Sequence, residues 1–147
     1  MNSSDVKILL VEDDDIDANA VLRGLALAKV GNQVVRAREG AEALDILLGT
    51  NGRKKLQPPY LLLIDIRMPK LNGLDLVREI RSNRMLRRTI IFVLTTSDND
   101  LDLTAAYDAH VAGYIVKSNG EDQFLKFANM LEYYMMIVTP PPVEAYG

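Results

Sequence analysis

The sequence of 147 residues contains no cysteine. This absence excludes disulfide bonds, thiolate metal sites and cysteine nucleophiles, and it suits the reducing cytoplasm in which we expect the protein to work. The longest apolar runs, at residues 60–64 and 90–94, are far shorter than the ~20 residues of a membrane-spanning helix, so we expect no membrane association. The N-terminal residues lack a basic segment followed by an apolar one, and we therefore expect no signal peptide.

The sequence also lacks a strong excess of charge. Its 17 basic and 20 acidic residues leave a net charge of −3, which argues weakly against nonspecific binding to nucleic acid. Hydrophobic residues at 48% and charged residues at 25% are ordinary for a globular protein of one domain. We expect that domain to span residues 1–138. A proline-rich tail should follow at residues 139–147, because three consecutive prolines cannot continue a helix.

Short apolar runs that are nearly continuous predict the strands. The clearest are residues 6–11 (VKILLV), 60–64 (YLLLI) and 89–94 (TIIFVL), and weaker candidates are residues 33–36 and 113–116. Continuous runs are typical of parallel strands that are buried on both faces. Helical spacing of apolar residues follows each strand. Five alternations of strand and helix predict an α/β fold with helices on both faces of a parallel sheet.

Polar residues that could bind a metal or take part in catalysis lie at the ends of four of the predicted strands. Glu12 and Asp13 follow the first strand, Asp65 follows the third, Thr95 ends the fourth and Lys117 follows the fifth. Ligands of an open parallel sheet bind at the carboxyl ends of its strands. Carboxylates that converge there repel one another unless a cation joins them, and oxygen-only ligands favour Mg²⁺ or Mn²⁺. An aspartate beside such a metal, a hydroxyl and an ammonium is a suitable phosphoryl acceptor.

Each of these residues also has a structural explanation when it is taken alone. Acidic residues after a strand often cap the next helix, which would account for Asp14 or Asp15. Lys117 by itself would be interpreted as a solvated surface lysine, and a threonine at the end of a strand is common. Only their joint placement at four strand ends favours the functional interpretation.

Four segments carry a family resemblance. ILLVEDD at 8–14, LLLIDIRMPKLNG at 61–73, VLTTS at 93–97 and AGYIVK at 112–117 resemble the motifs of response-regulator receiver domains in two-component signalling. The similarity extends over residues 6–138. It implies a flavodoxin-like, three-layer sandwich whose five-stranded parallel sheet has the order 2-1-3-4-5.

The resemblance implies a role for each acidic residue. Asp65 would accept a phosphoryl group from a sensor histidine kinase. Asp13 and Asp65 would ligate Mg²⁺ directly, with the backbone carbonyl of Arg67, and Glu12 would act through metal-bound water. The protein would then be a signalling switch and not an enzyme, apart from self-phosphotransfer and autodephosphorylation.

The resemblance also implies how the switch works. Thr95 and Lys117 would contact the phosphoryl oxygens, and Tyr114 would change rotamer when Thr95 moves. Most receivers have a proline after the lysine, joined by a cis peptide bond, but this chain has Ser118. A cis bond before a residue other than proline costs ~2.5–4 kcal/mol. Either this bond is trans and the loop differs, or the strain is kept.

A narrower resemblance concerns the connection at 49–59, the segment 95–117 and the long final helix. These resemble the small single-domain regulators that partner bacterial phytochromes, which implies a bacteriophytochrome as the kinase. The final helix also carries a second apolar stripe, at Met130, Tyr133 and Ile137. A helix that packs on one sheet buries only one face. The resemblance to the phytochrome regulators, which often dimerise through this end, implies a homodimer through the last helix and the tail. Coverage by the kinase or by the folded-back tail is the alternative.

Two other functional classes remain open. A Mg²⁺-dependent phosphohydrolase commonly has a second aspartate two residues after its nucleophile. Here that position holds Arg67, which cannot serve as a general acid/base, so the sequence disfavours this class. The Arg67 side chain either reaches over the phosphoryl group and alters its hydrolysis or is an exposed loop arginine. A phosphorylation-independent binding module with the receiver fold is the other class, and the complete set of acids and lysine disfavours it. We interpret the arginines between residues 78 and 88 as a solvated helix end, and we expect no nucleic-acid partner.

Overall fold

A computed structural model of the chain describes residues 5–68, 72–95, 99–117 and 121–142. Strands and helices alternate along these residues. The strands are β1 (Lys7–Val11), β2 (Val34–Ala37), β3 (Tyr60–Ile64), β4 (Ile90–Thr95) and β5 (Gly113–Val116). The helices are α1 (Asp15–Leu27), α2 (Gly40–Leu48), α3 (Gly73–Ser82), α4 (Asp100–Asp108) and α5 (Glu121–Ile137).

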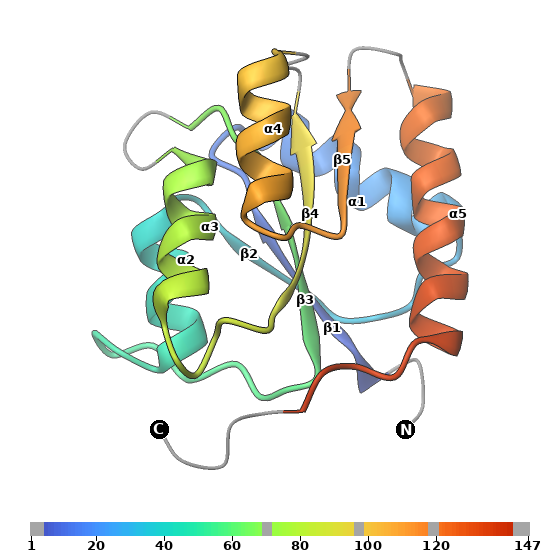
Figure 1. The fold of residues 1–147 in the computed structure, drawn as a ribbon. Helices are drawn as coiled ribbons and strands as arrows, with labels where there is room; N and C mark the ends of the chain where they lie inside the picture. The colour runs from blue at the N-terminus through green and yellow to red at the C-terminus, as the bar shows by residue number, and fades with distance from the viewer. Residues whose placement is uncertain (1–4, 69–71, 96–98, 118–120, 143–147) are drawn as a thin grey trace.

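All strand pairs are parallel, and the strands form one sheet in the order β2-β1-β3-β4-β5. Helices cover both faces of this sheet, which makes three layers (Figure 1). The expected fold and strand order are therefore confirmed. Each of the five predicted strands lies within one residue of its expected position, because a continuous apolar run is a strong signal for a strand buried on both faces.

Two hydrophobic cores lie on the two faces of the sheet. Side chains of α2, α3 and α4 pack on one face, and side chains of α1 and α5 pack on the other. Successive residues of a strand point to opposite faces, so Leu9 and Leu62 belong to the first core while Ile8 and Leu61 belong to the second. This construction holds the carboxyl ends of the strands at one edge of the sheet.

Arg81 of α3 joins two segments at the opposite edge of the sheet. Its guanidinium donates to the backbone carbonyls of Ala109 and Thr89, at 2.8 and 2.7 Å, and also to those of Arg87 and His110. Burial lowers the pKa of this guanidinium. The interpretation of this region as a solvated helix end is therefore wrong for Arg81, whose role is structural.

The described part of the C-terminal segment, residues 139–142, does not cover the second apolar stripe of α5. Residues 139–142 run along the edge of the sheet where the strands begin, and with Pro58, Pro59 and the end of α5 they line a cavity of about 380 Å³. Met130, Tyr133 and Ile137 remain 42%, 66% and 80% exposed. The described residues of the tail therefore leave this apolar stripe exposed. Within the same residues, none of the helices has the length and apolar character that crossing a membrane requires.

Candidate functional site

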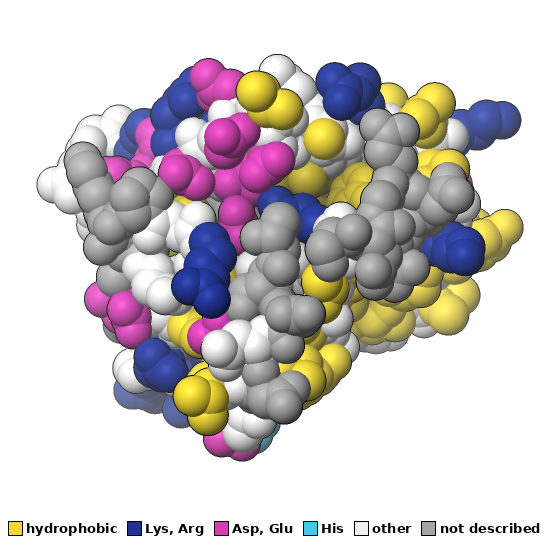
Figure 2. Space-filling view, turned by 90° about the horizontal axis from the view of Figure 1, so that it is seen from above, with side chains coloured by type: hydrophobic (Ala, Val, Ile, Leu, Met, Phe, Trp, Pro, Cys, Tyr) yellow, Lys and Arg dark blue, Asp and Glu magenta, His cyan; other side chains and the backbone are white. Residues whose placement is uncertain are grey.

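Four of the site residues predicted from the sequence lie at the carboxyl ends of the strands. Glu12 follows β1, Asp65 follows β3, Thr95 ends β4 and Lys117 follows β5. Glu12, Asp65 and Thr95 are buried although they are polar, with 1%, 7% and 0% of their surface exposed. Figure 2 shows that acidic side chains gather on this face of the molecule. Buried polar groups of this kind need partners, which the site supplies.

Lys117 is the cation at the centre of the site. Its Nζ donates to Glu12 Oε1 at 3.1 Å, and it lies 3.7 Å from Asp65 Oδ2 and 3.7 Å from Asp17 Oδ2. Burial favours a lower pKa for this ammonium, but the charges of Asp65 and Glu12 outweigh burial and the net pKa shift is upward. One positive charge therefore faces three carboxylates, and the site keeps an excess of negative charge.

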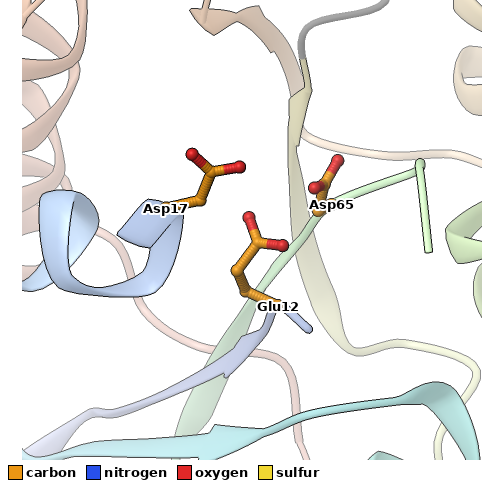
Figure 3. A group of neighbouring side chains, drawn as sticks. All are labelled: Glu12, Asp17 and Asp65. Atoms are coloured by element: carbon orange, nitrogen blue, oxygen red, sulfur yellow. The ribbon is translucent and has the colours of Figure 1, made fainter. Parts of the chain in front are cut away.

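The third carboxylate of this group, Asp17, was missed by the sequence reasoning. Glu12, Asp17 and Asp65 each offer an oxygen, and these three oxygens lie within 4.8 Å of one another. Figure 3 shows the three side chains pointing toward a common space. Asp17 lies in the first turn of α1, and its backbone N–H donates to the Asp14 side chain, which caps the helix, at 2.9 Å. The signal in the sequence was its place in the alternating aspartates Asp13, Asp15 and Asp17, directly after the first predicted strand.

The donor set of the site fits a hard divalent cation. All three grouped ligands are carboxylate oxygens, which Mg²⁺ and Mn²⁺ prefer. Asp13 is half-buried and lies outside this group, so its direct ligation of the metal stays a prediction. The structure also leaves the role of the Arg67 carbonyl a prediction.

The loop after β3 is held from both ends. The Asp65 backbone N–H donates to the Val11 carbonyl at 3.1 Å, and the Arg67 N–H donates to Asp65 Oδ1 at 3.1 Å. At the start of α3, the Gly73 N–H donates to the Ile66 carbonyl at 3.0 Å. The Asp65 carboxylate is therefore presented from a loop whose backbone is fixed on either side.

The Arg67 side chain points to α4. Its Nη2 donates to Asp102 Oδ2 at 3.2 Å, and 58% of the side chain is exposed. Of the two interpretations that the sequence left open, this placement is the exposed loop arginine, with a specific partner on α4.

The remaining predicted residues lie in or next to the last strands. Tyr114 of β5 is half-buried, and it packs against the core formed with α2, α3 and α4. Thr95 pairs in register with Val116 across β4 and β5. Ser118 lies outside the described residues, so the structure does not test the expectation for its peptide bond.

The burial of Glu12 has a consequence for stability. Burial, followed by repulsion from Asp65, raises the pKa of Glu12 from 4.5 to about 7, although Lys117 opposes the shift. Between these two values the unfolded chain has lost the proton that the folded protein keeps. Stability is therefore lost as the pH rises through this window.

We expect the ionisation of Glu12 to lower the stability of the metal-free protein by about 3 kcal/mol between pH 4.5 and 8. Urea unfolding in EDTA at several pH values measures this loss. Glu12→Gln should remove it, because glutamine does not titrate. Equal pH dependence of the wild type and Glu12→Gln would contradict the assignment.

Comparison with known proteins shows the family of the chain. Residues 8–129 match the response regulator receiver domain, and the chain therefore belongs to this family. The response regulator Rcp1 of Synechocystis sp. is 33% identical over 135 residues, which cover 91% of this chain and 92% of Rcp1. The probable methanogenesis regulatory protein FilR2 of Methanothrix harundinacea is 35% identical over 130 residues, which cover 87% of this chain and 83% of FilR2.

Solved structures of similar proteins agree with this assignment to the receiver family. The phosphorylated cyanobacterial phytochrome response regulator RcpA is 34% identical, with a TM-score of 0.83 over 94% of this chain and 99% of RcpA. The Mn²⁺-bound form of Rcp1 is 32% identical, with a TM-score of 0.81 over 93% of this chain and 99% of Rcp1. The protein is thus a response regulator whose function depends on phosphorylation, and its receiver domain is a signalling switch.

Proposed function

We propose that Asp65 is the phosphoryl acceptor of this response regulator and that a sensor histidine kinase is the donor. The observation that carries the proposal is the position of Lys117, whose Nζ lies 3.7 Å from Asp65 Oδ2 and 3.1 Å from Glu12 Oε1. A carboxylate oxygen of Asp65 attacks the phosphorus of a phosphohistidine, the new P–O bond forms, and the P–N bond breaks as the imidazole leaves. The ammonium of Lys117 is close enough to stabilise the transferred charge.

The acidic residues of the site hold the metal in this proposal. Asp17 joins Glu12, Asp13, Asp65 and the Arg67 carbonyl as a source of oxygen ligands, and the Mn²⁺ in the solved Rcp1 structure supports a divalent cation here. Bound Mg²⁺ or Mn²⁺ would offset negative charge on the phosphoryl oxygens. Without that charge, three carboxylates and one ammonium would repel an incoming phosphoryl group.

The switch follows from the residues that face the acceptor. The hydroxyl of the buried Thr95 binds a phosphoryl oxygen, Tyr114 follows it inward, and the surface of α4, β5 and α5 changes. The output is a change in protein–protein contacts, and the only chemistry is self-phosphotransfer and autodephosphorylation. The Arg67–Asp102 ion pair supports this proposal, because it joins the loop of the acceptor to α4.

Intact mass after incubation with acetyl phosphate and Mg²⁺ tests the acceptor. We expect one phosphoryl group on the wild type and none on Asp65→Asn. Asp108→Asn, an equal change at the exposed end of α4, is the matched control and should behave as the wild type does. Equal uptake by Asp65→Asn would refute the assignment. A wild type that takes up neither phosphate nor beryllofluoride would favour the phosphorylation-independent binding module.

The kinase in our proposal is a bacteriophytochrome, and both proteins act in the cytoplasm. The similarity to RcpA and to the bacteriophytochrome response regulator AtBRR, which is 30% identical with a TM-score of 0.74 over 95% of this chain and 97% of AtBRR, supports this partner. Radiolabelled phosphotransfer from a bacteriophytochrome kinase, compared with an unrelated histidine kinase, measures the preference. We expect faster transfer from the bacteriophytochrome, and equal rates would contradict this choice of kinase.

The proposal includes a homodimer through α5 and the tail, with the receiver domain at residues 1–138 and the tail at residues 139–147. The exposed stripe of Met130, Tyr133 and Ile137 supports it, because contiguous apolar surface of this kind marks an interface. Sedimentation of Tyr133→Glu should show a shift toward monomer. Leu101→Glu is the control, since Leu101 is 79% exposed on α4, and an equal effect of both variants would contradict this interface.

A further inference from the structure

Arg36, at the carboxyl end of β2, contacts the acidic loop with all three guanidinium nitrogens. Nε and Nη2 donate to the backbone carbonyl of Glu12 at 3.0 and 2.9 Å, and Nη1 donates to Asp15 Oδ1 at 2.7 Å. Only 21% of the side chain is exposed. The planar fork of an arginine suits such a set of acceptors, and lysine has no equivalent geometry.

The carbonyl that Arg36 binds belongs to the peptide group that joins Glu12 to Asp13. This group is planar, so a fixed direction of the oxygen also fixes the direction of the backbone on both sides. The N–H of Glu12 donates to the Ala37 carbonyl at 3.0 Å, and strand β2 thus holds Glu12 at both of its backbone groups. Two proposed metal-site residues are attached to the peptide group that this arginine orients.

We propose that Arg36 is a positioning residue of the metal site, which holds the Glu12–Asp13 peptide in the orientation that divalent cation binding requires. This inference rests on the proposed function. The hydrogen bonds of Arg36 to the Glu12 carbonyl and the positive charge of Arg36 have opposite effects on the affinity of the site for a metal. A positive charge near the site repels a divalent cation, so its removal would by itself strengthen metal binding. In contrast, loss of a hydrogen bond that orients the metal ligands weakens metal binding, commonly by about 10–100-fold.

Arg38 provides a matched control on the same side of the site. Its Nη1 donates to the same Asp15 oxygen at 2.8 Å, and its side chain is 61% exposed. No contact of Arg38 with the Glu12 carbonyl is among the hydrogen bonds that the structure describes. Arg36→Met and Arg38→Met therefore remove the same charge, but only the first removes the contact that orients the peptide.

Electron paramagnetic resonance of free Mn²⁺ measures the affinity of each variant directly, without any phosphoryl donor. We expect Arg36→Met to bind Mn²⁺ about tenfold more weakly than the wild type. Arg36→Lys should also bind more weakly, because it keeps the charge without the fork. Arg38→Met should bind as tightly as the wild type or more tightly. Wild-type or tighter binding by both Arg36 variants would overturn the inference.

Two further measurements keep the result interpretable. Circular dichroism confirms that each variant is folded at the assay temperature, and Arg36→Lys decides the matter if Arg36→Met is unfolded. Intact mass with acetyl phosphate at saturating Mn²⁺ should still show a phosphoryl group on the Arg36 variants. If the wild type is phosphorylated but the Arg36 variants bind Mn²⁺ as tightly as the wild type, the inference about Arg36 is wrong and the proposed function stands. A wild type that binds no Mn²⁺ removes the proposed metal site as well.

Discussion

Replacement of Lys117 by methionine is expected to slow phosphorylation of Asp65 by acetyl phosphate about 10²–10³-fold. Among the described residues near the acceptor, Lys117 supplies the ammonium that faces Asp65, Glu12 and Asp17 together. Methionine has a similar length and no charge, so packing around the stem is largely kept while the electrostatic stabilisation is lost. Time-resolved intact mass at a fixed Mg²⁺ concentration measures the rate.

Two comparisons define what this result means. Lys126→Met changes an exposed lysine of α5 and should leave the rate as it is in the wild type. Lys117→Arg keeps a positive charge in a different shape, and we expect an intermediate rate. A wild-type rate for Lys117→Met would show that the ammonium takes no part in the transfer.

Gly73→Ala is expected to destabilise the protein by about 3 kcal/mol or more and to impair phosphorylation of Asp65. A Cβ atom at Gly73 would lie 2.3 Å from the carbonyl oxygen of Asp65 and 2.7 Å from Ile66 Cα. Both are backbone atoms, so no side-chain rotation relieves the contact. Helix α3 and the loop that presents the acceptor must then separate, and the carboxylate of Asp65 moves away from Lys117.

Gly31→Ala is the matched control for this substitution. Nothing lies within 4 Å of a Cβ atom at Gly31, and we expect little change in stability or in phosphorylation. Urea unfolding gives the free-energy difference for each variant, and intact mass gives the phosphorylation rate. Equal stability of the two alanine variants would contradict the close approach of α3 to the Asp65 backbone.

Tertiary structure decided which acids meet. Asp13 and Asp17 lie four residues apart, and only the direction in which α1 leaves β1 determines that Asp17 lies in the group with Glu12 and Asp65. The sequence contains several aspartates near this point, and local patterns do not distinguish one that faces the site from one that caps a helix. The sequence therefore did not identify Asp17 as a site residue, and the direct ligation of the metal by Asp13 remains a prediction.

Long-range contacts of arginine were equally invisible in the sequence. Arg36 reaches the Glu12 carbonyl over 24 residues of chain, and Arg81 reaches the Ala109 carbonyl over 28. Such contacts depend on which strands are neighbours and on where loops end. An arginine in a polar segment carries no local sign of them, which is why Arg81 was wrongly interpreted as solvated.

From the sequence alone one could predict the strands, their alternation with helices and the polar residues at the strand ends. Continuous apolar runs report burial on both faces, and the residues that follow them must lie at one edge of a parallel sheet. The strand order came from the family resemblance and was confirmed. The distances between side chains of the site depend on the tertiary structure, because the 3.1 Å contact between Lys117 and Glu12 joins residues 105 positions apart in the chain. Composition and periodicity place residues on elements, and packing then determines which of their side chains meet.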